Sequence, residues 1–144
     1  DALFDGRKLR ILNVIDHFNR ESPGQKLGFN LPARSVIEFL EQMIELHGKP
    51  KHIRTDNGPE FRSKLFQKWL KNNSIEWSRI QKGKPQQNAI IERFNKTYRE
   101  DVLDANIFKN IDHATQVSQT WLKDYNYVRP HQSLNYKTPV EYAA

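Results

Sequence analysis

The sequence predicts an α/β domain in which helices cover a mixed sheet. Short apolar, strand-like runs concentrate in the first part of the chain, and amphipathic helical segments separate and follow them. A length of 144 residues fits one compact domain. In sheets of this kind, functional sites form where strand ends meet loops. Functional residues are therefore expected at the strand ends.

The strand predictions rest on runs of Ile, Leu and Val that are bounded by turn residues. We expect strands over residues 8–16, 25–29, 51–55 and 74–80. Helical periodicity predicts helices over residues 31–46, 60–71, 88–103 and 111–127. Residues 81–88 contain no apolar side chain and predict an exposed loop, and residues 128–144 predict an irregular tail with a short helix at 139–143.

The composition favours a polyanionic partner. The chain has 23 Lys and Arg against 17 Asp and Glu, a formal charge of +6. Basic residues that neutralise phosphates release counterions, which favours binding to nucleic acid. The absence of cysteine excludes disulfides and zinc-thiolate sites. No long apolar run is present, so we expect no membrane partner.

Asp56 lies where a predicted strand ends in a turn. It follows the run HIRT and precedes Asn57 and Gly58. One interpretation is structural, because Asp before Asn-Gly commonly forms an Asx-turn. The other is functional, because a carboxylate at a strand end projects from the edge of the sheet. The tripeptide alone leaves both open.

Glu92 lies on the predicted helix of residues 88–103. Positions 91, 94, 98 and 102 carry apolar side chains at helical spacing and predict the packed face. Glu92, Asn95, Lys96 and Arg99 fall on a neighbouring stripe. The stripe is interpreted either as a solvated face with an ion pair between Glu92 and Lys96, or as a site. Glu92 alone does not decide between them.

Together the two carboxylates suggest a metal site. Mg²⁺ takes oxygen ligands and is often held by a few carboxylates and a substrate phosphate. A pair of such ions activates the attacking oxygen and stabilises the leaving oxygen at phosphorus. That chemistry needs about three converging carboxylates on separate elements, and a strand end and a helix supply two. Between positions 56 and 92 lie 35 residues.

This spacing, with TDNGPEF at the first carboxylate and NAIIERFNKTYRE at the second, resembles the DDE integrase core of bacterial insertion-sequence transposases and retroviral integrases. The tail NYVRPHQSLNYKTPVEY is similar to the Arg-Pro-His segment of the insertion-sequence branch. The segments VIDHFNRE and LEQMIELHGKPKHIRTDNG also resemble that branch. The resemblance covers essentially the whole chain, and the ordered set of motifs is specific.

The resemblance implies an RNase H-like fold with a five-stranded mixed sheet flanked by helices. It implies that residues 1–144 are the catalytic core of a longer transposase. By matching position, Asp56 and Glu92 are the second and third carboxylates of the triad and the metal ligands. The implied cofactor is a pair of Mg²⁺ or Mn²⁺ ions, with no small-molecule cofactor.

The resemblance also implies contacts with DNA, both transposon ends and target. Asn95, Lys96 and Arg99 match positions on the helix that contacts DNA ends, and Lys82 and Lys84 match the loop before it. The two loop lysines are equally well interpreted as solvated charges. We further expect a homo-oligomer, since two DNA ends must be brought together, and a cytoplasmic, nucleoid-associated bacterial protein.

The first Asp of the triad is not found at its expected position. Counting back from Asp16 places it a few residues before Asp1, so we expect the first strand to be cut short in this chain. Asp1 is the alternative ligand, Asp5 is interpreted as part of a turn, and Asp16 as a structural carboxylate. If the first Asp is missing from the molecule, catalysis should be severely reduced.

Two other functions stay open. An RNase H-like nuclease would use the same metals but would only hydrolyse DNA. A non-catalytic DNA-binding or assembly module would lack the first Asp in the complete protein. The three tryptophans are interpreted as core or interface residues, and no histidine is assigned to metal.

Overall fold

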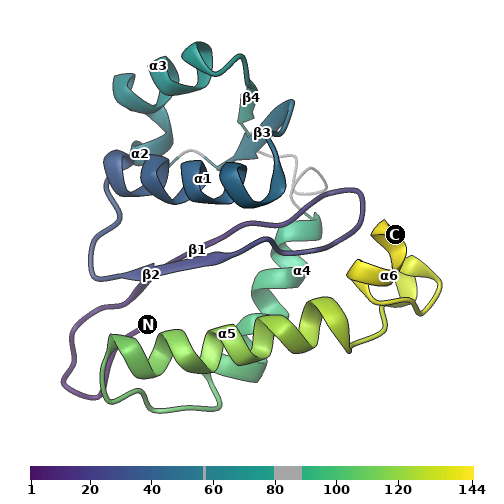
Figure 1. Cartoon of the computed structure of the whole chain (residues 1–144). Helices are drawn as coiled ribbons and strands as arrows, with labels where there is room; N and C mark the ends of the chain where they lie inside the picture. Colours follow the sequence, from purple (N-terminus) through teal and green to yellow (C-terminus); the bar gives the residue numbers. More distant parts are fainter. Residues whose placement is uncertain (57, 80–88) are drawn as a thin grey trace. The chain divides into compact units, whose positions relative to one another are not determined.

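The computed structural model describes residues 1–56, 58–79 and 89–144 (Figure 1). These residues form two compact units. Unit 1 combines Asp1–Phe29 with Ile90–Ala144, and unit 2 is Asn30–Ala89. No helix in the described ranges is long and apolar enough to cross a membrane. The α/β class is confirmed, and each unit is described by itself below.

Unit 1 is built on an antiparallel hairpin. Strand β1 (Arg10–Asn13) pairs with β2 (Gln25–Gly28), and Asn13 faces Gln25 across the ladder. A two-stranded sheet is marginal in water unless a helix packs on it. Helix α5 (Ile111–Tyr127) supplies this packing against β2 (Figure 1). The N-terminus adds one antiparallel bridge, from Ala2 to Lys8.

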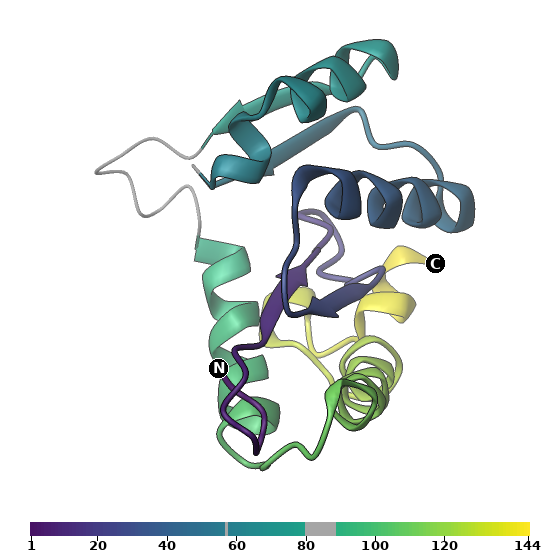
Figure 2. The ribbon, with the colours of Figure 1, turned by 90° about the vertical axis from the view of Figure 1, so that its left-hand side faces the viewer.

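Helix α4 (Ala89–Tyr98) runs beside the hairpin and continues into one π-helical turn, η2 (Arg99–Leu103) (Figure 2). The packed face predicted from periodicity is confirmed, because Phe94, Tyr98 and Val102 are buried. These side chains join a core that α5 closes. The core of unit 1 consists of Leu3, Leu9, Leu27, Phe94, Tyr98, Val102, Phe108, Ala114, Trp121 and Tyr125.

The tail of unit 1 is ordered by short helices. A 3-10 turn, η3 (Gln132–Leu134), precedes α6 (Pro139–Ala143), and α6 packs on α5. Thr138 and Glu141 form a reciprocal capping box, which satisfies two backbone N–H groups at the start of α6. The predicted short helix over residues 139–143 is confirmed.

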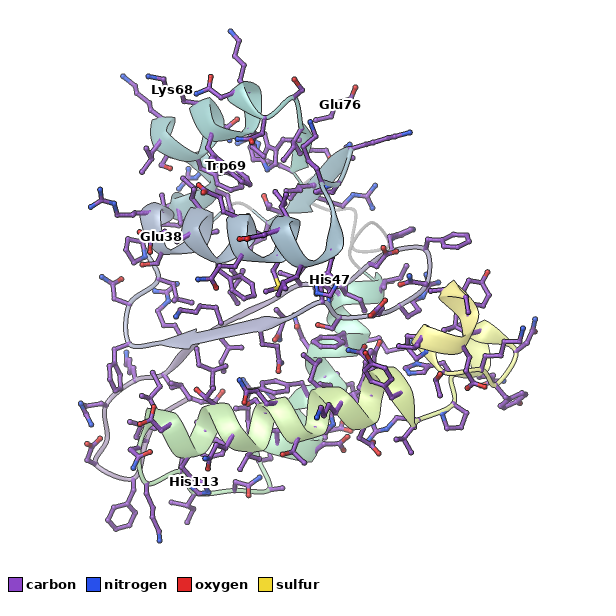
Figure 3. The ribbon with its side chains drawn as sticks, in the orientation of Figure 1. Glu38, His47, Lys68, Trp69, Glu76 and His113 are labelled. Atoms are coloured by element: carbon purple, nitrogen blue, oxygen red, sulfur yellow. The ribbon has the colours of Figure 1, made fainter. Side chains whose placement is uncertain are left out.

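Unit 2 carries two parallel strands, β3 (His52–Thr55) and β4 (Glu76–Arg79). Helix α1 (Ala33–His47) precedes β3 and ends at Gly48, whose φ of 93° suits glycine. Helix α3 (Lys64–Asn72) packs on α1 and on β4. Trp69 of α3 points toward α1 (Figure 3), stacked on the buried Phe66. A structural role for this tryptophan agrees with the expectation from sequence.

Two sequence predictions for the secondary structure need correction. The helix expected over residues 60–71 is two helices, α2 (Pro59–Arg62) and α3 (Lys64–Asn72). The break falls at Ser63, because its extended backbone lets the hydroxyl accept a hydrogen bond from the Phe66 N–H and start a new helix. The five-stranded sheet is not confirmed: the described residues hold four strands in two sheets.

Candidate active site and DNA-contact residues

Asp56 lies directly after β3, at its carboxyl end. Thr55 before it is buried; its hydroxyl donates to the Asp56 carbonyl oxygen and accepts from the Trp77 indole N–H, at 2.8 and 3.0 Å. Asp56 itself is exposed, and its Oδ1 accepts a hydrogen bond from the Gly58 N–H at 2.8 Å. The Asx-turn interpretation is therefore confirmed. It occupies one lone pair of the carboxylate and is compatible with a second role.

Glu92 lies in the first turn of α4 and is exposed. A carboxylate there is favoured by the positive end of the helix dipole. Asn95, Lys96 and Arg99 are exposed as well. The burial of Phe94 and Tyr98 on the other side of the helix confirms the stripe that the sequence predicts. Unit 1 therefore presents a carboxylate, an amide and two cations along one helix.

Two residues of this stripe are bonded to the rest of unit 1. The Asn95 Oδ1 accepts a hydrogen bond from Asn13 Nδ2 at 2.8 Å. Arg99 makes a two-pronged pair with Asp1, at 3.0 and 2.9 Å, and its Nη1 lies 3.7 Å from Asp104 Oδ1. A DNA phosphate that contacted Arg99 would therefore compete with these carboxylates for its guanidinium group. Asp1 acts as its partner here, which does not support the alternative that Asp1 is a metal ligand.

Asp16 has the structural role expected of it. Its Oδ1 accepts hydrogen bonds from the backbone N–H groups of Phe18 and Asn19, at 2.8 and 3.2 Å. Its own carbonyl accepts from the Arg20 N–H at 2.9 Å, and Arg20 has a positive φ of 65°. The carboxylate thus holds the tight turn after β1. This use of its oxygens explains the acid at a strand end without a metal.

The predicted site residues are distributed over both units. Asp56 belongs to unit 2, whereas Glu92, Asn95, Lys96 and Arg99 belong to unit 1. Lys82 and Lys84 lie outside the described residues, as does Asn57. Among the residues that the structure describes, no three His, Cys, Asp or Glu side chains are grouped to hold a metal ion. That Asp56 and Glu92 bind metal ions in one shared site stays a prediction.

Sequence reasoning missed a polar cluster that joins the tail to η2. Asp101 Oδ2 accepts from the Trp121 indole N–H and from Arg129 Nη1, both at 2.9 Å. Arg129 also reaches Asp124 at 3.4 Å. The hydrogen bond from Trp121 and the Arg129 guanidinium lower the pKa of Asp101. The Arg-Pro-His motif is the sequence feature that could have indicated this cluster, because an Arg just after a helix end often forms ion pairs with nearby carboxylates.

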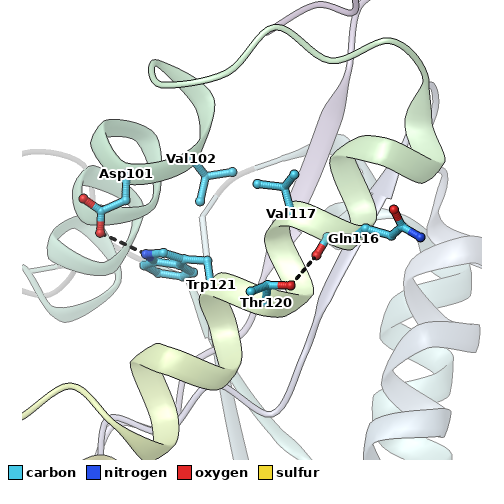
Figure 4. Close-up of a pocket in the computed structure, with 6 residues that line it drawn as sticks. All are labelled: Asp101, Val102, Gln116, Val117, Thr120 and Trp121. Atoms are coloured by element: carbon cyan, nitrogen blue, oxygen red, sulfur yellow. Dashed lines mark hydrogen bonds between the residues drawn. The ribbon is translucent and has the colours of Figure 1, made fainter.

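A pocket of about 370 Å³ opens beside this cluster (Figure 4). Asp101 and Val102 of η2 and four residues of α5 line it: Gln116, Val117, Thr120 and Trp121. Trp121 is held in place by its bond to Asp101, which Figure 4 draws. The lining offers one carboxylate, already paired twice, so this pocket lacks the converging oxygen donors of a metal site.

Comparisons with known proteins define the class of this chain. Two sequence profiles described as "Integrase core domain" match it, one over residues 1–85 and one over residues 73–139. The chain belongs to the integrase core domain family. Its resemblance to the insertion-sequence branch is confirmed by bacterial relatives from such elements.

The chain is 40% identical over 144 residues to the uncharacterized 31.7 kDa protein of insertion element IS407 from Burkholderia multivorans. It is 29% identical to the putative transposase InsK of IS150 from Escherichia coli. These matches cover 100% and 96% of this chain but 52% and 50% of the relatives. The chain thus spans about half the length of these relatives.

Solved structures show the same fold at low identity. The magnesium complex of the HTLV-2 integrase catalytic core, in its trimeric form, has a TM-score of 0.77 and 22% identity, and covers 99% of this chain and 90% of that one. The BIV integrase core has a TM-score of 0.75 and 17% identity, with coverages of 98% and 87%. The fold is therefore that of integrase catalytic cores, which is RNase H-like.

Proposed function

We propose that this chain is the catalytic core of a DDE transposase of the insertion-sequence type. It would hydrolyse a phosphodiester at the end of the element and then join the freed 3′-hydroxyl to target DNA. The observation that carries the proposal is the pair of exposed carboxylates, Asp56 after β3 and Glu92 on α4. By the resemblance of their sequence motifs, they match the second and third acids of the integrase triad.

The donor chemistry of Asp56 and Glu92 fits Mg²⁺ or Mn²⁺. Both offer exposed carboxylate oxygens, the ligand type these hard cations take. The Asx-turn uses only Oδ1 of Asp56, so Oδ2 is left for a cation. A pair of bound ions would activate a water and offset charge at the phosphorus. The HTLV-2 integrase core, to which this fold is similar, is described in complex with magnesium.

The chain's own cations would hold the DNA. Lys96 is one turn from Glu92 and exposed, which suits a phosphate contact beside the reacting bond. Arg99 has a planar fork that binds phosphate oxygens two at a time, but only after yielding part of its pairing with Asp1. Lys82 and Lys84 would add phosphate contacts ahead of α4. The formal charge of +6 supports this proposal.

The proposals for the whole protein extend beyond this chain. We propose transposon ends and target DNA as substrates, a homo-oligomer as the active assembly, and the bacterial cytoplasm as the location. Dimeric and trimeric forms are described for the HTLV-2 integrase core. We also propose the five-stranded mixed sheet of an RNase H-like core, of which the described residues hold four strands.

The test replaces Asp56 by Asn in the complete protein and measures strand transfer of a pre-cut 3′-end with Mg²⁺. Asn keeps the Asx-turn bond to Gly58 and loses only the charge, so the local fold is preserved. Strand transfer should fall at least roughly hundredfold. Glu92→Gln should do the same. Retained activity in either variant would sink the proposal.

Charge-matched controls separate the site from general electrostatics. Glu38→Gln removes an exposed carboxylate from α1, and Glu100→Gln removes one from η2. Both should keep strand transfer within about twofold, since surface charges away from special features rarely matter. Hydrolysis of the element end without joining would instead identify a nuclease of the same fold.

A further inference from the structure

The core-facing side of the β1–β2 hairpin ends in two amides. Asn13 and Gln25 are direct cross-strand partners, so their side chains stand on the same face. Their neighbours on that face are Ile11 and Leu27, which pack in the core of unit 1. An apolar pair would continue the core, whereas a polar pair must find hydrogen-bond partners. Asn13 finds one of them on α4.

Three amides form one chain of hydrogen bonds. Gln25 Nε2 donates to Asn13 Oδ1 at 2.7 Å, and Asn13 Nδ2 donates to Asn95 Oδ1 at 2.8 Å. The second bond joins residues 82 positions apart, so it fixes the end of the hairpin against α4. Asn95 is three positions from Glu92, on the same exposed stripe. The chain of amides thus ends beside the proposed active site.

The buried amide of Gln25 determines which way the three side-chain amides are oriented, and so which atom of each one donates. Gln25 Oε1 is buried and has no hydrogen-bond partner in the part of the chain that the structure describes. Reversing all three amides would bury the Gln25 NH₂ group there instead. A buried orphan carbonyl is tolerated better than a buried orphan N–H. The bonds therefore run toward Asn95.

This direction decides what Asn95 presents to solvent. Its Oδ1 is occupied by Asn13, so its exposed Nδ2 faces outward with N–H groups to donate. The DNA surface offers phosphate oxygens, which accept hydrogen bonds and take most contacts from proteins. An Asn95 turned the other way would instead set a carbonyl oxygen against a phosphate, which is repulsive.

We propose that Asn13 is a positioning residue that orients the Asn95 amide to donate to a DNA phosphate next to Glu92. The proposal rests on the proposed function and adds a residue to it. Asn13 does not touch DNA itself and acts through Asn95. Because the contact is made by a neutral amide, it contributes to affinity without releasing a counterion.

The experiment is a double-mutant cycle on DNA binding by the complete protein without divalent metal. The probe is a fluorescein-labelled random-sequence DNA duplex, followed by anisotropy over a range of salt concentrations. Asn13→Leu and Asn95→Leu should each weaken binding by roughly tenfold to a hundredfold, the contribution of one hydrogen bond to a charged group. The slope of log affinity against log salt should stay unchanged.

The double variant decides between positioning and a general structural role. If Asn13 acts through Asn95, Asn13→Leu should have no further effect once Asn95 is Leu. Additive losses would overturn the proposal, as would an unchanged affinity in Asn13→Leu. Asn13→Asp keeps the size of the side chain but cannot donate, so Asn95 must turn its N–H inward. Its loss of affinity should exceed that of Asn13→Leu.

Asn106→Leu is the matched control. It removes an amide that donates to the Val102 carbonyl oxygen at 2.8 Å in the same unit. This variant should unfold at lower urea concentration but keep wild-type affinity for the duplex. If it weakens binding as much as Asn13→Leu does, lost stability explains both and the proposal fails. If the wild-type protein does not bind the duplex, the result would instead contradict the proposed function itself.

Discussion

At the scale of single residues, Tyr98 shows how a polar group is accommodated in the core of unit 1. Its hydroxyl lies 2.6 Å from the Ser118 Oγ, and both side chains are buried. Burial raises the pKa of Tyr98, so the hydroxyl stays protonated. The pair links α4 to α5 and therefore supports the helix that carries Glu92.

We predict that Tyr98→Phe lowers the free energy of unfolding by about 1–2 kcal/mol, because Ser118 is left buried without its partner. The double variant Tyr98→Phe with Ser118→Ala should regain most of that loss, since both polar groups are then removed together. Urea unfolding at neutral pH measures both. A double variant that is less stable than Tyr98→Phe would contradict the pairing.

Residue-level interpretation from sequence was correct for the helix stripe and incomplete for Asp56. The spacing of Phe94, Tyr98 and Val102 determined which side of α4 is buried, so the exposure of Glu92 followed. At Asp56 the sequence offers the Asx-turn and the site as alternatives, whereas one carboxylate has enough lone pairs for both. Asn13 was not found, because a single Asn in an apolar strand does not reveal its partner 82 residues away.

At the scale of elements, the tail after α5 (residues 128–144) packs on that helix. The His131 ring lies edge-on to Tyr125, with ring centroids 4.6 Å apart, and its backbone pairs with Lys137. Arg129 of this tail donates a hydrogen bond to Asp101 on η2. The motif that signalled the family in the sequence therefore has a structural use, which is to hold the tail and η2 on α5.

Stability should fall as the pH is lowered through about 6.5, the usual pKa of His. Burial lowers the pKa of His131, and the charges of Arg129 and Arg20 lower it further, against a bond to the Tyr125 carbonyl. A base with a depressed folded pKa is neutral in the folded protein, so the unfolded chain takes up the proton first. The stability that His131 contributes is thus present above pH 6.5 and lost below it.

Urea midpoints between pH 7.5 and 5.5 measure this dependence. His131→Gln should flatten the loss across that range. His17→Gln, which changes an exposed ring in the turn after β1, should keep it. Equal slopes in the two variants would show that the burial of His131 is not the cause.

The bounds of helices and strands predicted from the sequence agree with the structure where the periodic pattern extends over many residues. The helix over residues 111–127 has the expected bounds, because seventeen residues carry the pattern and Asn110 caps it. The helix expected over 60–71 divides at Ser63, since a serine hydroxyl satisfies a backbone N–H only when the helix restarts there. The strand expected over 8–16 shortens to Arg10–Asn13, because pairing with β2 covers only those residues.

At the scale of the whole molecule, electrostatic attraction to DNA is the dominant expectation. Lys96→Gln should weaken duplex binding for every sequence and lower the magnitude of the salt slope by about 0.9, since one phosphate contact releases one counterion. Lys123→Gln on α5 removes the same charge from another exposed position. It should leave the slope unchanged, as anisotropy over a salt series measures. A slope that falls equally in both variants would indicate diffuse attraction only.

The sequence by itself determined the fold class and the family and predicted the two candidate carboxylates, because periodicity, turn chemistry and the ordered spacing of motifs are local or linear properties. Only the tertiary structure decided which groups those residues meet: the Asx-turn at Asp56, the pairing of Arg99 with Asp1, and the amide chain that ends at Asn95. The physical reason is that a hydrogen bond depends on distance and direction between atoms far apart in the chain. The metal site expected from Asp56 and Glu92 stays a prediction, since the two acids belong to different compact units and the described residues hold no group of three acidic, His or Cys side chains.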